Sequence, residues 1–331
     1  MIITRRTTLA ASLGGALLPF AGRAQGTAIP VGIAVSSNSL AYGGVHIALR
    51  AGLFEKQGLA LKIVTMDSGS AAMAAVLSGS MEFVSAGPSE VMAARLRGQN
   101  IVIVANIYRG LSGSLVLAKS AADKLAANPA SPIDAKLKAL DGLVIATPSA
   151  TSAYTLPYKS AAAALGVNLR FTYMAQPAML AAIEAGAIQG MIAGAPFSVA
   201  AVNNGKAVLW ISGPRGELPA SVMPRSSACI ETSEAYAAAH PDVIVRIQAA
   251  FASLSSFIHD HPDEALRHLT AAYSPVDPAI LQAVFKDEAQ NWANPVMSVD
   301  DVRQEIAIQA SSGSLKGVES VPPESLLVKL K

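Results

Sequence analysis

The apolar residues of this chain gather into short runs, and several of these runs end in a turn that contains glycine and serine. Between residues 52 and 90 the pattern predicts a helix end, a strand at 61–65, a turn, a helix, a strand at 81–85, a second turn and a helix that Glu90 opens. The strands are rich in β-branched and alternating apolar residues, whereas the helices are alanine-rich. Alternating strands and helices of this kind are typical of an α/β fold.

The same order recurs along the chain. We expect further strands at 29–35, 101–106, 115–118, 141–147, 171–174, 208–212 and 227–230, and further helices at 40–50, 154–165, 179–185, 243–259, 262–271, 278–289 and 299–310. Residues 119–140 are expected to form variable surface, with Lys136 and Lys138 on a solvated face. The halves 31–113 and 142–213 share this order without sharing sequence, which indicates two α/β lobes with a cleft between them.

Two turns, at residues 67–70 and 86–89, place Gly and Ser where a strand ends and a helix begins. The first N–H groups of a helix lack internal partners and its N-terminus is electropositive, so such turns favour an anion or a polar oxygen. Two turns at the ends of neighbouring parallel strands face one crevice. The serines and asparagine at 36–39 fit ordinary helix capping equally well.

The ordered motifs of residues 48–90 resemble those of the nitrate/sulfonate/taurine/thiamine-precursor group of ABC-transporter substrate-binding proteins. The matching positions are Ala48-Leu49-Arg50-Ala51-Gly52-Leu53-Phe54, Gly58-Leu59, Ser68-Gly69, Val76-Leu77-Ser78-Gly79, Glu82-Phe83 and Gly87-Pro88. A single glycine match would be weak, but the ordered set is specific. Two departures stand out later in the chain: Ser149 or Ala150 replaces the usual glycine of one turn, and Gln189-Gly190 replaces a common aspartate.

The resemblance implies an α/β, two-lobed periplasmic-binding-protein-like fold of type II, with its ligand cleft at the lobe interface. Two crossings between lobes are expected near 108–118 and 209–215, which gives lobe 1 as residues 27–112 plus 215–331 and lobe 2 as 113–214. The C-terminal helices are expected to pack on lobe 1.

We predict ligand contacts from both lobes at the turns. The first lobe and the crossing contribute Ser37, Asn38, Gly69, Ser70, Gly87, Ser89 and Arg109, and the second contributes Ser149, Thr151, Ser152 and Ala195. The Arg109 guanidinium is suited to sulfonate or carboxylate oxygens; a solvent-facing loop arginine is the open alternative. Neutral donors with one arginine favour a small anionic or polar organic ligand such as a sulfonate, nitrate or taurine.

By this resemblance the chain is a monomeric receptor that closes around its ligand and delivers it to an ABC permease in the inner membrane. One alternative is a thiamine-pyrimidine-precursor binding protein or a related biosynthetic enzyme. Another alternative is a sensor domain that has lost its role in transport.

The N-terminus has the features of a secretory signal peptide. A charged segment containing Arg5-Arg6 precedes an uncharged Ala/Leu/Gly-rich run to Phe20 and small residues up to Ala24, where we expect cleavage. The paired arginines favour the twin-arginine route. The apolar run of about 14 residues is shorter than the ~20 that a transmembrane helix needs. The mature protein is therefore expected in the periplasm.

Composition excludes several classes of protein. A length of 331 residues allows about two domains, and 52% hydrophobic with 15% charged residues argues against disorder. A net charge of +2 gives no case for nucleic-acid binding. Cys229 is the only cysteine, so a disulfide within the chain is excluded, and we expect a small buried residue there.

Catalytic and metal-binding patterns are absent from the sequence. The titratable residues between His259 and His268 surround Pro262, which is ordinary helix-opening chemistry. The chain has no HExxH, no phosphate-binding loop and no G-x-S-x-G. His46 is expected to be a packed histidine. We therefore expect a binding protein that is not an enzyme and carries no cofactor or metal.

Overall fold

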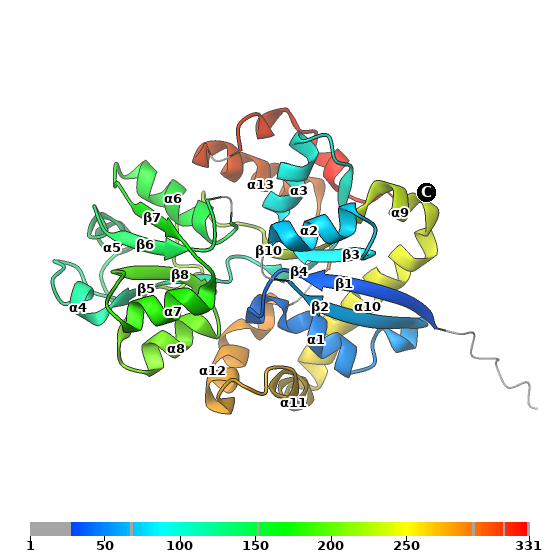
Figure 1. Ribbon diagram of the computed structural model, residues 1–331, viewed down its shortest axis with the longest axis horizontal. Helices are drawn as coiled ribbons and strands as arrows, with labels where there is room; N and C mark the ends of the chain where they lie inside the picture. Colours follow the sequence, from blue (N-terminus) through cyan, green and yellow to red (C-terminus); the bar gives the residue numbers. More distant parts are fainter. Residues whose placement is uncertain (1–27, 67–68, 151, 293–294, 314, 330–331) are drawn as a thin grey trace, which may run out of the picture.

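The computed structural model describes residues 28–66, 69–150, 152–292, 295–313 and 315–329 (Figure 1). The predicted signal peptide and Thr151 lie outside these residues. Within the part of the chain that the structure describes, none of the helices is long and apolar enough to cross a membrane.

The first sheet has the strand order β2-β1-β3-β10-β4. Strand β1 (Ile29–Val35) pairs in parallel with β2 (Leu59–Thr65) and β3 (Phe83–Ala86). Strand β10 (Ser226–Ser233) lies antiparallel between β3 and β4 (Ile101–Arg109). The chain therefore leaves this sheet after β4 and returns to its middle with β10.

The intervening residues form a second sheet of order β7-β6-β8-β5-β9. Its strands are β5 (Gly113–Ala118), β6 (Val144–Thr147), β7 (Arg170–Tyr173), β8 (Gly190–Gly194) and β9 (Ala207–Ile211). Strand β5 is antiparallel to β8 and β9, whereas β6 is parallel to β7 and β8. The predicted two-lobed α/β fold with two crossings is confirmed, and Figure 1 shows the second lobe in green beside the first.

Helices cover both sheets. Those of the first lobe are α1 (Gly43–Arg50), α2 (Gly69–Leu77), α3 (Pro88–Leu96), α9 (Glu234–Ala239), α10 (Pro241–Asp260), α11 (Pro262–Ala272), α12 (Pro278–Glu288) and α13 (Val299–Ser312). Those of the second are α4 (Lys119–Ala122), α5 (Ile133–Lys138), α6 (Thr155–Ala164), α7 (Gln176–Glu184) and α8 (Phe197–Asn203). Proline opens α3, α10, α11 and α12, where a missing N–H costs nothing. Short 3₁₀ turns lie at Leu40–Tyr42, Glu55–Gln57, Ala289–Asn291, Val318–Ser320 and Pro323–Leu326.

Each lobe has its own hydrophobic core. Phe54, Phe251 and Trp292 lie in the core between the first sheet and helices α1, α10 and α11, whereas α2, α3 and α13 enclose a second core on the opposite face. Trp210 lies in the core of the second lobe, together with Leu218 and Val222. This core therefore continues beyond residue 214, where the sequence placed the end of lobe 2.

The expected solvated face at Lys136 is wrong. Lys136 is only 5% exposed, and its Nζ lies 2.6 Å from Glu217 Oε2. Helix α5 packs against β9, where Trp210 Nε1 donates to the Lys136 carbonyl at 3.1 Å. The lysine is buried because its helix covers the edge of the second sheet, and Glu217 compensates its charge.

Candidate functional site

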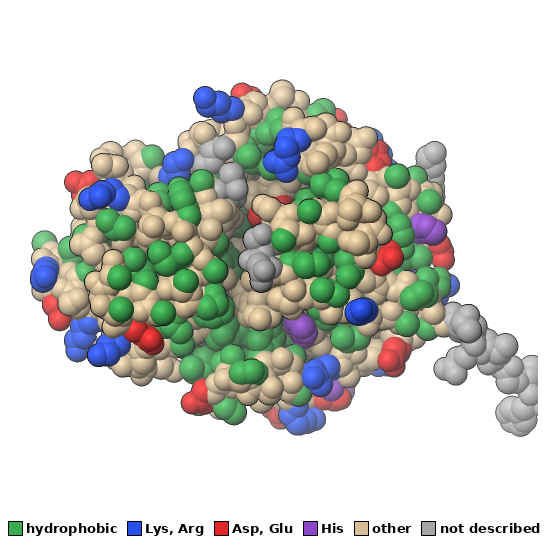
Figure 2. Space-filling view, in the orientation of Figure 1, with side chains coloured by type: hydrophobic (Ala, Val, Ile, Leu, Met, Phe, Trp, Pro, Cys, Tyr) green, Lys and Arg blue, Asp and Glu red, His purple; other side chains and the backbone are tan. Residues whose placement is uncertain are grey.

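A cleft of about 740 Å³ lies between the two lobes. The first turns of α2 and α3 line it from the first lobe, and the segments that lead into α6 and α7 line it from the second. Figure 2 shows the corresponding hollow between the two halves of the molecule. A hollow of this size, bounded by two lobes, is where small-molecule sites usually occur.

Many of the predicted residues meet at this cleft. Its lining includes Ser37, Asn38, Gly69, Ser70, Gly87, Ser89, Ser149 and Ser152. The turns from the two lobes also approach one another closely, because a Cβ added to Gly87 would lie 3.3 Å from the Cβ of Ala153. The structure thus brings these residues together, while their contact with a ligand remains a prediction.

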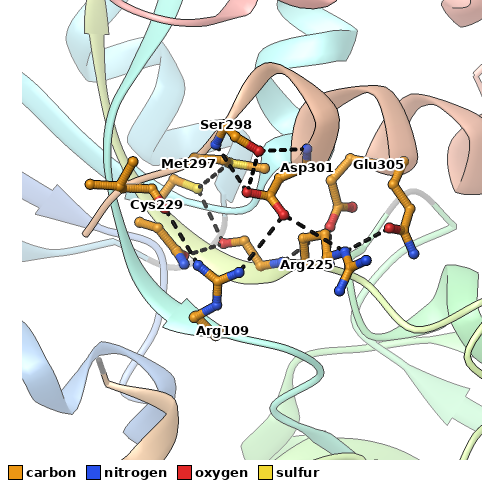
Figure 3. A network of polar contacts seen from close by, with 11 residues as sticks. Arg109, Arg225, Cys229, Met297, Ser298, Asp301 and Glu305 are labelled. Carbon is orange, nitrogen blue, oxygen red and sulfur yellow. Dashed lines mark hydrogen bonds and ion pairs between the residues drawn. The ribbon is translucent and has the colours of Figure 1, made fainter. Parts of the chain in front are cut away.

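Arg109 does not join them. Its Nη2 lies 3.7 Å from Asp301 Oδ1 and its Nη1 donates to the Val296 carbonyl at 3.4 Å (Figure 3). Asp301 is fixed by a capping box with Ser298 at the start of α13, and it also lies 3.7 Å from Arg225 Nε. Arg109 and Arg225 stand on the two crossings, so this network ties both crossings to α13.

Ala195 is also placed away from the cleft lining. It is buried, and its carbonyl accepts the Leu40 N–H at 2.7 Å and the Ser39 hydroxyl at 3.4 Å. Its backbone acceptor is therefore used in a contact between the lobes. Thr151 lies outside the described residues.

Ser39 connects the lobes as well as capping a helix turn. Its Oγ accepts the Ala41 N–H at 3.3 Å, as expected for a cap, and lies 2.9 Å from the Tyr154 hydroxyl of the second lobe. The Tyr273 hydroxyl donates to the Ser39 carbonyl at 3.0 Å. Local sequence signals reveal the cap but not the contact with Tyr154, which lies 115 residues away.

The sequence did not identify several other residues that line the cleft, among them Tyr42, Glu90, Arg97, Tyr154, Tyr173 and Gln176. Of the described lining residues, only Glu90 and Arg97 carry a formal charge. Glu90 was predicted only as a helix-opening residue. Its position three residues after Gly87, in a turn predicted to contact the ligand, was the one sequence feature that could have placed it at the cleft. The described cleft wall therefore carries one carboxyl group and one guanidinium, Glu90 and Arg97, in place of the single arginine, Arg109, that was predicted.

Glu90 is half-buried at the start of α3. Burial raises the pKa of its carboxyl, and hydrogen bonds from the Ser89 hydroxyl and the backbone N–H groups of Glu90 and Gly87 oppose that rise. Behind it, Glu231 on β10 is completely buried, and neither of its oxygens has a hydrogen-bond partner among the described residues. Burial and, secondarily, the charge of Glu90 raise the pKa of Glu231 well above its ordinary value.

His46 and Cys229 are packed, as expected. His46 packs edge-to-face on Tyr273 with ring centroids 5.4 Å apart, and Cys229 is buried. Among the described residues, no group of three or more His, Cys, Asp or Glu side chains is arranged to hold a metal ion.

Comparison with solved structures finds the same fold. A protein of Bordetella bronchiseptica superposes with a TM-score of 0.74 at 19% identity, over 91% of this chain and 94% of that one. The alkanesulfonate-binding protein SsuA of Xanthomonas axonopodis, solved bound to MOPS, gives 0.72 at 16% identity, over 90% and 97%. The periplasmic nitrate-binding protein NrtA of Synechocystis gives 0.68 at 10% identity, over 89% and 85%. The names of the last two describe them as binding proteins.

A search of the curated proteins found no match. A model of the NMT1-like family matches residues 40–274. The matched region spans both lobes and most of the chain, and the chain belongs to this family.

Proposed function

We propose that this member of the NMT1-like family is a periplasmic solute receptor that binds a small polar organic molecule between its lobes and delivers it to an ABC importer. The observation that carries the proposal is the cleft itself, where Ser37, Ser70 and Ser89 of one lobe face Ser149 and Ser152 of the other. The fold shared with sulfonate- and nitrate-binding proteins supports it.

The ligand would be bound by hydroxyl groups of both lobes. It would contact both lobes at once and so favour a closed arrangement over an open one. The crossings after β4 and β9 would act as the hinge. An importer permease would then recognise the closed form.

Two exposed apolar side chains on opposite walls of the cleft support closure. Leu77, at the end of α2, is 41% exposed, and Tyr173, at the end of β7, is 52% exposed. Bringing the lobes together around a ligand would remove part of this apolar surface from water, which contributes about 25 cal/mol for each Å² buried.

The proposed ligand class is a sulfonate-, nitrate- or taurine-like molecule. A thiamine-pyrimidine precursor is the alternative, and it fits a cleft with few charged groups. We further propose export by the twin-arginine route with cleavage near Ala24, which Arg5-Arg6 and the small residues up to Ala24 support, and a monomeric receptor, which the resemblance of residues 48–90 supports.

A thermal-shift screen over sulfonates, nitrate, carboxylates and pyrimidines tests the receptor proposal, because a ligand that binds the folded state raises the unfolding midpoint. Ser70→Trp should abolish the shift, since Ser70 is exposed on the cleft wall and an indole there would fill the site. Ser78→Trp is the matched control, because Ser78 is also exposed but does not line the cleft. Equal shifts in both variants would show that the compound binds elsewhere.

A further inference from the structure

Glu90 lies against the starts of helices α2 and α3. A Cβ added to Gly69 would meet Glu90 Oε1 at 3.0 Å, and one added to Gly87 would meet Glu90 Oε2 at 3.2 Å. Gly87 has extended backbone (φ −90°, ψ 159°), which any residue can adopt. The absence of a side chain at these two positions therefore leaves room for the carboxyl group.

The carboxyl also occupies the position that an anionic ligand would take at α3. It accepts the Ser89 hydroxyl at 2.8 Å, and the backbone amides of Gly87 and Glu90 lie close enough to lower its pKa. These are the donors that make a helix N-terminus attractive to an anion. Since the carboxyl group of Glu90 already lies beside these amides, a sulfonate or nitrate placed at this turn would meet its negative charge.

The α3 side of the cleft therefore offers a ligand a hydrogen-bond acceptor, the Glu90 carboxylate. A carboxylate accepts about four hydrogen bonds, and Glu90 lines the cleft, so accepting capacity remains on that side. We propose that Glu90 recognises a nitrogen-borne donor of the ligand, an ammonium, amino or amidino group. The inference rests on the receptor function proposed above and narrows its ligand class from simple anions to compounds that carry such a group.

An anionic group elsewhere on the same ligand is compatible with this assignment. Arg97, the C-cap residue that follows α3, also lines the cleft, seven residues after Glu90 and roughly 10 Å from it along the helix axis. A ligand with an amino group at one end and an acidic group at the other would match both ends of this wall.

Matched pairs of compounds that differ in one amino group test the assignment: taurine against ethanesulfonate, β-alanine against propionate, and aminopyrimidine against pyrimidine. Affinity is measured by calorimetry for the wild-type protein, for Glu90→Gln, and for Glu55→Gln, a control that removes an exposed carboxylate outside the cleft lining. We expect the wild-type protein to bind the amino member of at least one pair about tenfold or more tightly than its partner, as for a charged hydrogen bond. Glu90→Gln should lose that preference and Glu55→Gln should keep it.

Three outcomes contradict the inference in distinguishable ways. Equal affinity of the wild-type protein for both members of every pair that binds overturns the role of Glu90 and leaves the receptor function standing, whether or not the variant folds. A preference that persists in folded Glu90→Gln assigns it to another group. Failure of every compound in both classes to bind counts against the receptor function, and the inference falls with it.

Discussion

Replacement of Glu288 by glutamine should change how the stability of the protein depends on pH. Glu288 lies at the end of α12 and is 5% exposed. The Tyr108 hydroxyl donates to its Oε2 at 2.8 Å, and Asn291 Nδ2 donates to that hydroxyl at 3.3 Å. Burial nevertheless raises the pKa of Glu288 to about 8, against an ordinary value of 4.5.

The sign follows from proton linkage. Because the folded pKa lies above the unfolded one, Glu288 makes its full contribution to stability below about pH 4.5 and loses it as the pH rises to about 8. The two pKa values differ by about 3.5, and a difference of one in pKa corresponds to about 1.36 kcal/mol. The loss of stability therefore has an upper bound on the order of 5 kcal/mol. Glutamine keeps a polar partner for Tyr108 and carries no ionisable proton, so this part of the pH dependence should disappear.

The assay is urea unfolding of both proteins at a series of pH values from 4 to 9. We expect the free energy of unfolding of Glu288→Gln to rise relative to wild type as the pH increases, by about 2–5 kcal/mol across the range. Burial also raises the pKa of Glu305 to about 7, and the difference between the two proteins removes that shared contribution. Parallel curves for wild type and variant would refute the assignment of a raised pKa to Glu288.

Two further substitutions test the corrected positions of charged residues. Arg109→Ala should leave ligand affinity within about twofold and cost about 1 kcal/mol or less in urea unfolding, because its ion pair with Asp301 is partly exposed; a loss of affinity of tenfold or more would restore it to the site. Lys136→Ala should cost roughly 1–3 kcal/mol, since it removes the buried partner of Glu217 and leaves that carboxylate without its ion pair. An unchanged unfolding midpoint, followed by tryptophan fluorescence, would return Lys136 to a solvated position.

The elements of the fold were largely predictable because their signals are local. The predicted strand at 29–35 and the predicted helices at 262–271 and 278–289 begin at the same residues in the structure. Apolar runs and first-turn prolines mark these starts within a few residues of sequence. The recurrence of turn and helix after each strand also indicated two lobes.

The positions of charged side chains were less predictable because they depend on distant partners. Arg109 is drawn to Asp301, which lies 192 positions later in the chain and is fixed by its own capping box. Lys136 is buried because a helix covers a sheet edge. Glu90 shows an ordinary helix-opening pattern, and only the structure reveals that it lies beside Gly69 and Gly87 and lines the cleft.

The most direct test of the account is a crystal structure of the protein with the compound that raises its unfolding midpoint most. We predict that the compound lies in the cleft, within hydrogen-bond distance of the Ser70 or Ser89 side of one lobe and the Ser149 or Ser152 side of the other. Density for the compound on one lobe alone, or in the surface hollow between α11 and α12, would contradict a receptor that closes around its ligand.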